Sequence, residues 1–581
     1  MITRFFRKID WILLVVVGIL TFIQVYLELE IPGYMATITT IMTTGGTGQD
    51  VMDEGVWMLL CAFGSLLTAV LGGAVAANIG TNFGKTLRER QFSQVSKFSD
   101  EELNKFSIYS LITRSTNDVT QVQMAFTMGM VVAMRAPMMA IWALFKISSK
   151  NIEWSVATAI AVIAMVSCIV AILWFVHPKF KRIQWLNDDV NRITKEGLNG
   201  IRVIHAYNAE DYQEDKFKDA NKVLTGTHLS VTRGLSFLQP SMTLIMSVLS
   251  MSIYWIGAIL INDAFGMDRF TEFSDMIVFS SYAMQIIASF MMLLVIFMVL
   301  PRALVAYRRI IEVIDTEPTI LDGSLTESPD GLEGQISFKN VSFRYPGAAH
   351  DALTGISFDV KKGETVAIIG STGSGKTTLM KMIPRFYDVT EGSVTIDGID
   401  VKDYTLEALN RKIGYVPQKA VMFNGTIESN VNYGDTETER TEDDVVRAVS
   451  IAQGREFIEK MDKQYQSMIS EGGTNLSGGQ KQRVSIARAI CRKPEFYLFD
   501  DSFSALDYKT DRVLRTELKK ETAGVTTLII AQRIGTIMNA DKIIVLDEGR
   551  MVGMGTHDEL LRNCEVYHQI ALSQLTEEEL A

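Results

Sequence analysis

The sequence predicts a helical domain with six transmembrane spans, followed by an α/β domain built around a phosphate-binding loop. Three observations support this prediction. The chain has 581 residues, which is too long for a single domain. Its composition is 48% hydrophobic, and the long apolar stretches lie in the first half. The second half instead carries short alternating stretches and a glycine-rich loop that ends in Lys-Thr.

The charge and the cysteine content argue against two classes of protein. The formal net charge of -11 gives no electrostatic support for a general role in nucleic-acid binding. The four cysteines are scattered and show neither metal-ligand spacing nor a disulfide framework. We therefore expect neither a nucleic-acid partner nor a cysteine-based metal site.

Six stretches of the first half are long and apolar enough to cross a bilayer, which takes about 20 residues each. The first stretch follows a short basic segment, as in a signal peptide. It lacks a clear small-residue cleavage site, so we interpret it as an uncleaved span. The six stretches lie near residues 11–29, 56–79, 128–147, 154–176, 242–261 and 276–300.

The distribution of Lys and Arg predicts the orientation of the spans. Residues 32–55 contain no Lys or Arg, whereas 85–114 and 179–233 are rich in both. A short loop that holds Lys146 and Lys150 departs from this pattern but is too brief to reverse it. Basic loops stay on the cytoplasmic side. The chain is therefore predicted to be a multi-pass protein of the cell membrane, with its N-terminus and its second domain in the cytoplasm.

Charged and sulfur-containing residues inside the spans are candidates for function. Arg135 lies in an apolar run, where an ionisable residue is a functional candidate. The simpler interpretation places it near the cytoplasmic end of a long helix, facing water or a neighbour. Glu28 and Glu30 are expected at the outer rim of the first span. The methionines of the spans could line an adaptable pocket, although ordinary packing explains any one of them.

The domain boundaries follow from composition. Residues 315–334 are rich in Pro, Gly, Asp, Glu and Ser, which is typical of a linker. Residues 1–314 then form the membrane domain, and residues 335–581 form the α/β domain.

The phosphate loop occupies residues 370–378, between an apolar strand and a helix-like run. It fits the pattern G-x-x-x-x-G-K-[ST], whose glycines let backbone N–H groups turn toward phosphates. Lys376 can reach the terminal phosphates, and the Thr377 hydroxyl can bind Mg²⁺. The predicted phosphate-binding residues are Gly370, Ser371, Thr372, Gly373, Ser374, Gly375, Lys376, Thr377 and Thr378.

Further motifs support nucleotide chemistry. A hydrophobic strand ends in Asp500, placed to hold Mg²⁺, and in Asp501, placed to orient an attacking water. A Ser-Gly-Gly turn at 476–480 opens a helix and is a second anion-binding element. We expect it to grip a nucleotide held by another copy or by a partner. Tyr345 is available to stack on an adenine, although a lone aromatic residue is more often packed in a core.

Together these motifs resemble a half-transporter of the ABC superfamily, of the exporter type with six spans ahead of one nucleotide-binding domain. The resemblance covers nearly the whole chain. It implies that ATP and Mg²⁺ are the cofactors and that the nucleotide domains of two subunits pair head to tail. Residues near 110–114 and 206–212 resemble the two intracellular coupling helices.

The resemblance also implies a role for each site residue. Tyr345 corresponds to the adenine-stacking aromatic residue, residues 370–378 to Walker A, and Asp500 to the Walker B aspartate. Gln418, in Tyr-Val-Pro-Gln, corresponds to the glutamine that touches Mg²⁺. Residues 476–480 correspond to the ABC signature, of which Ser477, Gly478, Gly479 and Gln480 are expected to bind nucleotide.

Two departures from the family pattern stand at catalytic positions. Asp501 stands where the family normally has Glu, and Gln532 stands where it normally has His. Asp is one methylene shorter, and a misplacement of about 1 Å can reduce a rate about 100-fold. Gln can donate a hydrogen bond to the γ-phosphate but carries no positive charge. Both changes together resemble the degenerate member of a heterodimeric exporter, whose partner would carry Glu and His.

We therefore expect an exporter subunit that moves amphipathic drugs or lipid-like compounds, together with a second half-transporter and in contact with membrane lipids. Two alternatives remain open at this point. The first is a homodimeric exporter that hydrolyses slowly with Asp501. The second is an ATP-gated regulator or channel subunit, which needs ATP binding more than turnover.

Overall fold

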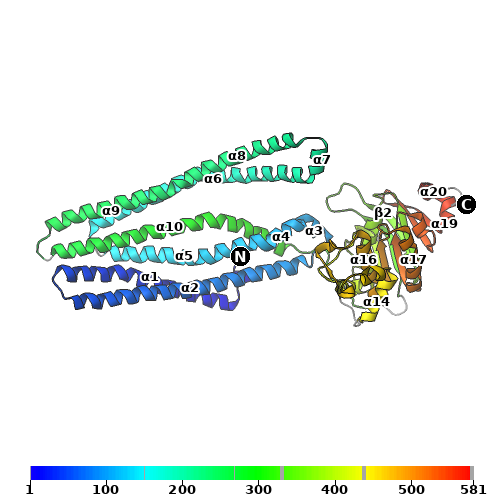
Figure 1. The fold of residues 1–581 in the computed structure, drawn as a ribbon, viewed down its shortest axis with the longest axis horizontal. Helices are drawn as coiled ribbons and strands as arrows, with labels where there is room; N and C mark the ends of the chain where they lie inside the picture. The colour runs from blue at the N-terminus through cyan, green and yellow to red at the C-terminus, as the bar shows by residue number, and fades with distance from the viewer. Residues whose placement is uncertain (1, 149–150, 267, 328–332, 435–439, 576–581) are drawn as a thin grey trace. The chain divides into compact units, whose positions relative to one another are not determined.

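The computed structural model describes residues 2–148, 151–266, 268–327, 333–434 and 440–575, so Lys150 lies outside the described residues. The chain forms two compact units (Figure 1). The first comprises Met1–Gln94 and Tyr109–Asp315, and the second comprises Val95–Ile108 and Thr316–Ala581. This division differs from the predicted boundaries, because the segment Val95–Ile108 of the predicted membrane domain groups with the second unit.

The first unit is entirely helical in its described part, and six of its helices or helix pairs are long and apolar enough to cross a membrane. This confirms the six predicted spans. The longest, Glu210–Asp263, has 54 residues, or about 80 Å at 1.5 Å per residue. A bilayer core is about 30 Å thick, so this helix pair extends well beyond it. The long helices are α1 (Lys8–Thr43), α2 (Gly48–Val95), α5 (Val119–Ser148), α6 (Ile152–Asn199), α8 (Glu210–Ser236), α9 (Leu238–Asp263) and α10 (Asp268–Asp315).

Short elements join these helices at the predicted coupling segments. Residues 110–114 fall in α4 (Ile108–Thr113) and at the start of the π-helical turn η2 (Arg114–Asp118). Residues 206–212 run from the last residue of α7 (Ile201–Ala206) into the first turn of α8. Helix α10 packs along α5, and α6 packs along α8 and α9 (Figure 1).

The charged residues of the spans form pairs between helices. Arg135 lies near the middle of α5, not near its cytoplasmic end, and its guanidinium contacts Glu28 of α1. Lys146 lies within α5, not in a loop, and contacts Glu30. Helix α1 continues to Thr43, so neither glutamate ends it.

The second unit is an α/β domain with two main sheets. The larger has the strand order β12-β11-β3-β10-β9-β6 and is parallel except for β12. A second, antiparallel sheet has the order β2-β1-β4-β5. The strands of the larger sheet are β3 (Thr365–Gly370), β6 (Ile413–Val416), β9 (Phe496–Asp500), β10 (Thr526–Ile530), β11 (Lys542–Asp547) and β12 (Arg550–Gly555); those of the smaller are β1 (Ile336–Phe343), β2 (Leu353–Val360), β4 (Glu391–Ile396) and β5 (Ile399–Asp400).

Burial on both faces explains why the parallel strands are nearly continuous in apolar residues. Strand β9 is buried along its whole length, and β3 is buried in its centre. The carboxyl ends of neighbouring parallel strands lie at the same edge, which is where open α/β sheets bind ligands. The helices of this unit that flank the site are α11 (Lys376–Met382), α16 (Gly478–Cys491) and α18 (Ile534–Ile537).

The short helix α3 (Asp100–Phe106) belongs to this second unit through specific polar contacts. Asp100 pairs with Lys381 of α11 at 2.8 Å. The Glu102 carboxylate accepts hydrogen bonds from the backbone and the hydroxyl of Thr319. Asn104 donates to the Tyr387 hydroxyl at 3.3 Å. The contacts therefore involve a segment upstream of the predicted coupling residues 110–114.

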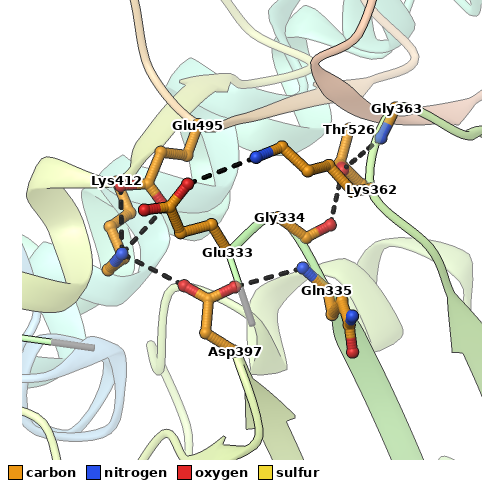
Figure 2. Close-up of polar contacts among 9 residues, drawn as sticks. All are labelled: Glu333, Gly334, Gln335, Lys362, Gly363, Asp397, Lys412, Glu495 and Thr526. Carbon is orange, nitrogen blue, oxygen red and sulfur yellow. Dashed lines mark hydrogen bonds and ion pairs between the residues drawn. The ribbon is translucent and has the colours of Figure 1, made fainter. Parts of the chain in front are cut away.

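A buried ion pair anchors the end of the linker to the α/β domain (Figure 2). The fully buried carboxylate of Asp397 accepts the Gln335 N–H at 3.1 Å and pairs with Lys412 at 3.1 Å. The Thr526 hydroxyl donates to the carbonyl of Gly334 at 2.6 Å. These bonds fix the chain just before β1 begins.

Removal of the ammonium group of Lys412 should destabilise the second unit. Lys412→Met removes the ammonium group that lies 3.1 Å from the buried Asp397 carboxylate, and breaking a buried pair in this way typically costs about 3–5 kcal/mol. Chemical denaturation of the purified chain should show a lower midpoint for the transition of this unit.

The matched control combines Lys412→Met with Asp397→Asn. The amide keeps an acceptor for the Gln335 N–H and removes the buried charge. The double variant should therefore regain most of the lost stability. Equal losses in the single and the double variant would contradict this account of charge compensation.

Candidate nucleotide site

The phosphate loop takes the conformation that its glycines allow. Gly375 caps the N-terminus of α11 with a left-handed φ of 97°. A Cβ there would lie 2.9 Å from the carbonyl oxygen of Ala352, and a Cβ at Gly370 would lie 2.1 Å from that of Leu546. Both positions therefore require glycine. The predicted residues begin at Gly370, the last residue of β3, and run through the loop into the first turn of α11.

Lys376 folds back across this loop. Its ammonium group donates to the carbonyls of Gly370 at 2.9 Å and Ser371 at 2.7 Å. Burial lowers the pKa of Lys376, while the charges of Asp501 and Asp500 act in the opposite direction. The ammonium group thus lies inside the loop, near both carboxylates, and phosphate oxygens could replace its carbonyl partners.

Thr377 and Asp500 lie together beneath the loop. The Thr377 hydroxyl donates to the Asp500 carboxylate at 2.9 Å. Burial raises the pKa of Asp500. A hydroxyl and a carboxylate are oxygen ligands of the kind Mg²⁺ takes, with water and phosphate oxygens completing its shell. These residues therefore fit Mg²⁺, and within the described residues no group of three or more His, Cys, Asp or Glu offers another metal site.

Asp501 is held by two amide side chains. Its Oδ2 accepts hydrogen bonds from Gln532 at 2.7 Å and from Gln418 at 3.3 Å. Its backbone has a left-handed φ of 46°, which turns the chain sharply after β9. Burial raises the pKa of Asp501, and the hydrogen bond from Gln418 opposes this shift. The same carboxylate oxygen therefore receives both amides from within the chain.

Tyr345 lies beside the start of α11. Its hydroxyl and that of Thr378 are 3.0 Å apart. Its ring packs edge-on against Phe343 and Tyr387, with centroids 4.9 and 5.3 Å away. The ring is half-buried, so part of it is accessible to a ligand.

The signature residues form a helix cap. Ser477 caps α16, and its hydroxyl accepts the backbone N–H of Gln480, while the Gln480 side chain accepts the N–H of Ser477. Ser477 and Gly478 are exposed, and Gly479 is half-buried. No hydrogen bond recorded among the described residues joins this cap to the phosphate loop. The structure thus brings the loop, Asp500, Asp501, Gln418 and Gln532 together, but not the signature.

Two side chains at the site were missed by sequence reasoning. The Tyr415 hydroxyl lies 3.5 Å from the Asp500 carboxylate, and Gln482 donates to the carbonyl of Pro417 at 3.3 Å. Tyr415 belongs to the same Tyr-Val-Pro-Gln motif as Gln418, so that motif could have indicated it. The partner of Gln482 lies far away in sequence, and no spacing rule would have found it.

Comparison with known families agrees with both units. Residues 14–290 match the ABC transporter transmembrane region, and residues 353–504 match the ABC transporter family. Together the two matched regions cover most of the chain.

Individual relatives match over nearly the full length. An uncharacterized ABC transporter ATP-binding protein of Mycobacterium tuberculosis is 35% identical over 554 residues, covering 94% of this chain and 93% of that protein. An ATP-dependent lipid A-core flippase of Pseudomonas fluorescens is 31% identical over 517 residues, covering 88% and 84%.

A solved structure has the same fold. A bacterial Atm1-family ABC exporter with ATP bound aligns with a TM-score of 0.75 and 24% identity, over 97% of this chain and 98% of that one. The chain therefore belongs to the ABC transporter family, as an exporter-type half-transporter of the membrane whose cytoplasmic ATPase domain drives transport.

Proposed function

We propose that this chain is the degenerate-site subunit of a heterodimeric exporter for amphipathic, lipid-like or drug-like compounds. The observation that carries the proposal is the double amide contact on Asp501. In this proposal the chain binds ATP at its own loop but turns it over slowly. Its signature completes the faster site of a partner half-transporter.

Different residues of the site bind the phosphates, the adenine and Mg²⁺. Lys376 and the backbone of the loop hold the phosphates, and Tyr345 stacks on the adenine. Thr377, Asp500 and Gln418 would hold Mg²⁺, which neutralises phosphate charge when bound. The 2.9 Å contact between Thr377 and Asp500 supports this assignment.

Slow turnover follows from the geometry of Asp501. A carboxylate that orients water needs an oxygen aimed at that water. The Asp side chain is one methylene shorter than that of Glu, so its carboxylate lies farther from the attacking water. In addition, Gln532 and Gln418 both donate hydrogen bonds to its Oδ2. Gln532 also cannot bring a positive charge to the γ-phosphate. Together these effects favour a loss of about 100-fold in rate, the size that misplacement by about 1 Å can produce.

The signature supports a partner with a complete catalytic pair. Ser477 and Gln480 form an intact and partly exposed anion-binding cap, which is not bonded to the chain's own loop. Head-to-tail pairing of nucleotide domains would place this cap on the partner's ATP. That partner would carry Glu and His where this chain has Asp501 and Gln532.

Two observations favour an amphipathic cargo. One relative is named a lipid A-core flippase. In the membrane unit, an open apolar pocket of about 890 Å³ is lined by hydroxyl, aromatic and methionine side chains of α9 and α10. Flexible thioethers suit a surface that adapts to varied ligands. The lining residues are Thr243, Met246, Ser247, Ser250, Met251, Tyr254, Trp255, Ala258 and Met284.

ATP hydrolysis should depend on the partner. The chain purified alone should hydrolyse ATP at a rate at least about 10-fold below that of the complex with its partner half-transporter. The measurement is phosphate release at saturating ATP, normalised to nucleotide domains. Brisk turnover by the chain alone as a defined dimer would show that Asp501 is a working catalytic residue and would remove the need for a partner.

Restoring both family residues should activate this site. Asp501→Glu lengthens the side chain that carries the carboxylate. Gln532→His removes one of the two amide donors and supplies an imidazole that can be charged. In a complex whose partner lacks its own catalytic carboxylate, this double substitution should raise hydrolysis by about 100-fold. Asp501→Asn is the control and should give no increase. An unchanged rate in the double variant would contradict the account.

The residual activity of the unmodified site should be sensitive to acid. Burial raises the pKa of Asp501, so its carboxylate protonates at a less acidic pH than an ordinary aspartate does. The protonated form cannot accept a proton from water, so the rate should fall as the pH is lowered through this raised pKa. A pH profile of kcat/KM in the same partner-silenced complex tests this, because kcat/KM reports the groups of the free enzyme. A profile that follows only the titration of ATP itself would contradict it.

A further inference from the structure

Two ion pairs join helices α1 and α5, one near the middle of α5 and one in its last turn. The Arg135 guanidinium contacts both carboxylate oxygens of Glu28, at 2.9 and 3.0 Å. The Lys146 ammonium contacts Glu30 at 2.8 Å. The four side chains are 23–30% exposed, so they are largely withdrawn from the surface yet still accessible.

These pairs stand among buried apolar residues. Val25 and Leu29 of α1 pack with Met139 and Ala143 of α5 in one hydrophobic cluster. A pair of charges in such surroundings is seldom more stable than apolar side chains of the same size. Ionisable residues in membrane helices accordingly mark functional positions by default. Stability alone therefore does not account for two such pairs on one helix interface.

Two buried donors beside the pairs have no acceptor. Among the described residues, neither Nε of Arg135 nor Nε1 of Trp142 has a hydrogen-bond partner. The Trp142 ring packs edge-on against Phe22 and Tyr26 of α1, with centroids 5.9 and 6.0 Å away. Unpaired buried donors are costly unless a further group accepts from them. The same helix pair thus offers charges of both signs, free donors and an aromatic surface.

We infer that this α1–α5 site, comprising Glu28, Glu30, Arg135, Trp142 and Lys146, binds the headgroup of a zwitterionic amphiphile. The inference rests on the proposed export of amphipathic compounds and names their headgroup class. A zwitterion carries an anionic group for the guanidinium and indole donors and a cationic group for the carboxylates. Its apolar chain lies along the aromatic surface.

The charge balance of the site selects this class. The site holds two positive and two negative side chains, so its formal charge is zero. An anionic headgroup would take Arg135 or Lys146 and leave a glutamate unpaired in apolar surroundings. A cationic headgroup would instead pair with a glutamate and leave Arg135 or Lys146 without its carboxylate. Only a ligand with both a positive and a negative group can pair with the carboxylate and with the basic side chain once their ion pair is broken.

Four probes with the same twelve-carbon chain test the headgroup directly. They are dodecylphosphocholine, dodecyl phosphate, dodecyltrimethylammonium and uncharged dodecyl maltoside. The full chain, without nucleotide, is titrated with each probe, and bound molecules are counted by native mass spectrometry. The zwitterionic probe should bind about 10-fold more tightly than each of the other three. Equal affinities for all four headgroups would overturn the inference.

Substitution of one ion pair locates the site. Glu28→Gln with Arg135→Met removes one of the two pairs, leaves Lys146 with Glu30, and should reduce the preference for the zwitterion at least about 3-fold. Lys85→Met with Glu89→Gln, which removes an exposed pair on α2, is the matched control and should leave binding unchanged. Unchanged preference in the Glu28 and Arg135 double variant would overturn the inference. If that variant does not fold, Trp142→Phe replaces the indole with a smaller aromatic ring and removes the free donor. It should weaken binding of the zwitterionic probe about 3-fold, and unchanged binding would then overturn the inference.

A further titration distinguishes a bilayer lipid from a free amphiphile as the ligand of this site. The titration is repeated in nanodiscs of phosphatidylethanolamine and of phosphatidylglycerol. Weaker probe binding in phosphatidylethanolamine means that a bilayer lipid occupies the site, and equal binding means a free amphiphile; both results support the inference. Because binding is measured without ATP or partner, failure of the heterodimer proposal leaves this result intact. Failure of the headgroup preference leaves the ATPase predictions intact.

Discussion

Asp397, Arg135 and Asp501 are charged groups withdrawn from bulk water, and each is compensated locally in a different way. Asp397 is fully buried and balanced by Lys412, which fixes the start of the α/β domain. Arg135 is balanced by Glu28 across two membrane helices. Asp501 accepts hydrogen bonds from two neutral amides, and the positive charges of Lys376 and Arg533 act on it at longer range. Since an uncompensated buried charge is strongly unfavourable, these contacts constrain which segments of the chain come together.

The kind of compensation also determines what each group can do. The Lys412 ammonium contacts both Asp397 and Glu495, and this group of charges serves stability. The pairs on α1 and α5 leave donors unused, which is why they suggest ligand binding. At Asp501 the amides of Gln418 and Gln532 hold the carboxylate in place without supplying a charge. In a family member with Glu and His at these two positions, the carboxylate stands on a longer side chain, and the imidazole beside it can be protonated. The proposed loss of turnover therefore has its physical origin in one oxygen atom that two amides share.

The phosphate loop and the spans could be predicted because their signals are local. Residues 370–378 form a continuous motif between a strand and a helix, and each span is a continuous apolar stretch. Contacts between distant segments could not be predicted in this way. Glu28 and Arg135 lie on separate helices, and the sequence around each residue does not indicate that the two are in contact. The helix α3 likewise gave no compositional sign that it groups with the α/β domain rather than with the spans.

For the candidate site, sequence reasoning named the residues but not their mutual contacts. Asp501 and Gln532 were singled out by their departure from a family pattern. Their hydrogen bond depends on β9 and β10 lying side by side in the sheet, with Asp500 beside Ile530. That adjacency follows from a crossover topology, which spacing along the chain does not reveal. The roles of these residues in hydrolysis remain predictions.

The central claim is that this chain retains ATP while its partner hydrolyses it. The most direct measurement is photo-crosslinking of the assembled complex with azido-ATP labelled at either the α- or the γ-phosphate, after turnover and arrest with vanadate. The account predicts that this chain keeps both labels, because its nucleotide is still ATP, and that the partner keeps only the α-label. Loss of the γ-label from this chain at the same rate as from its partner would contradict the account.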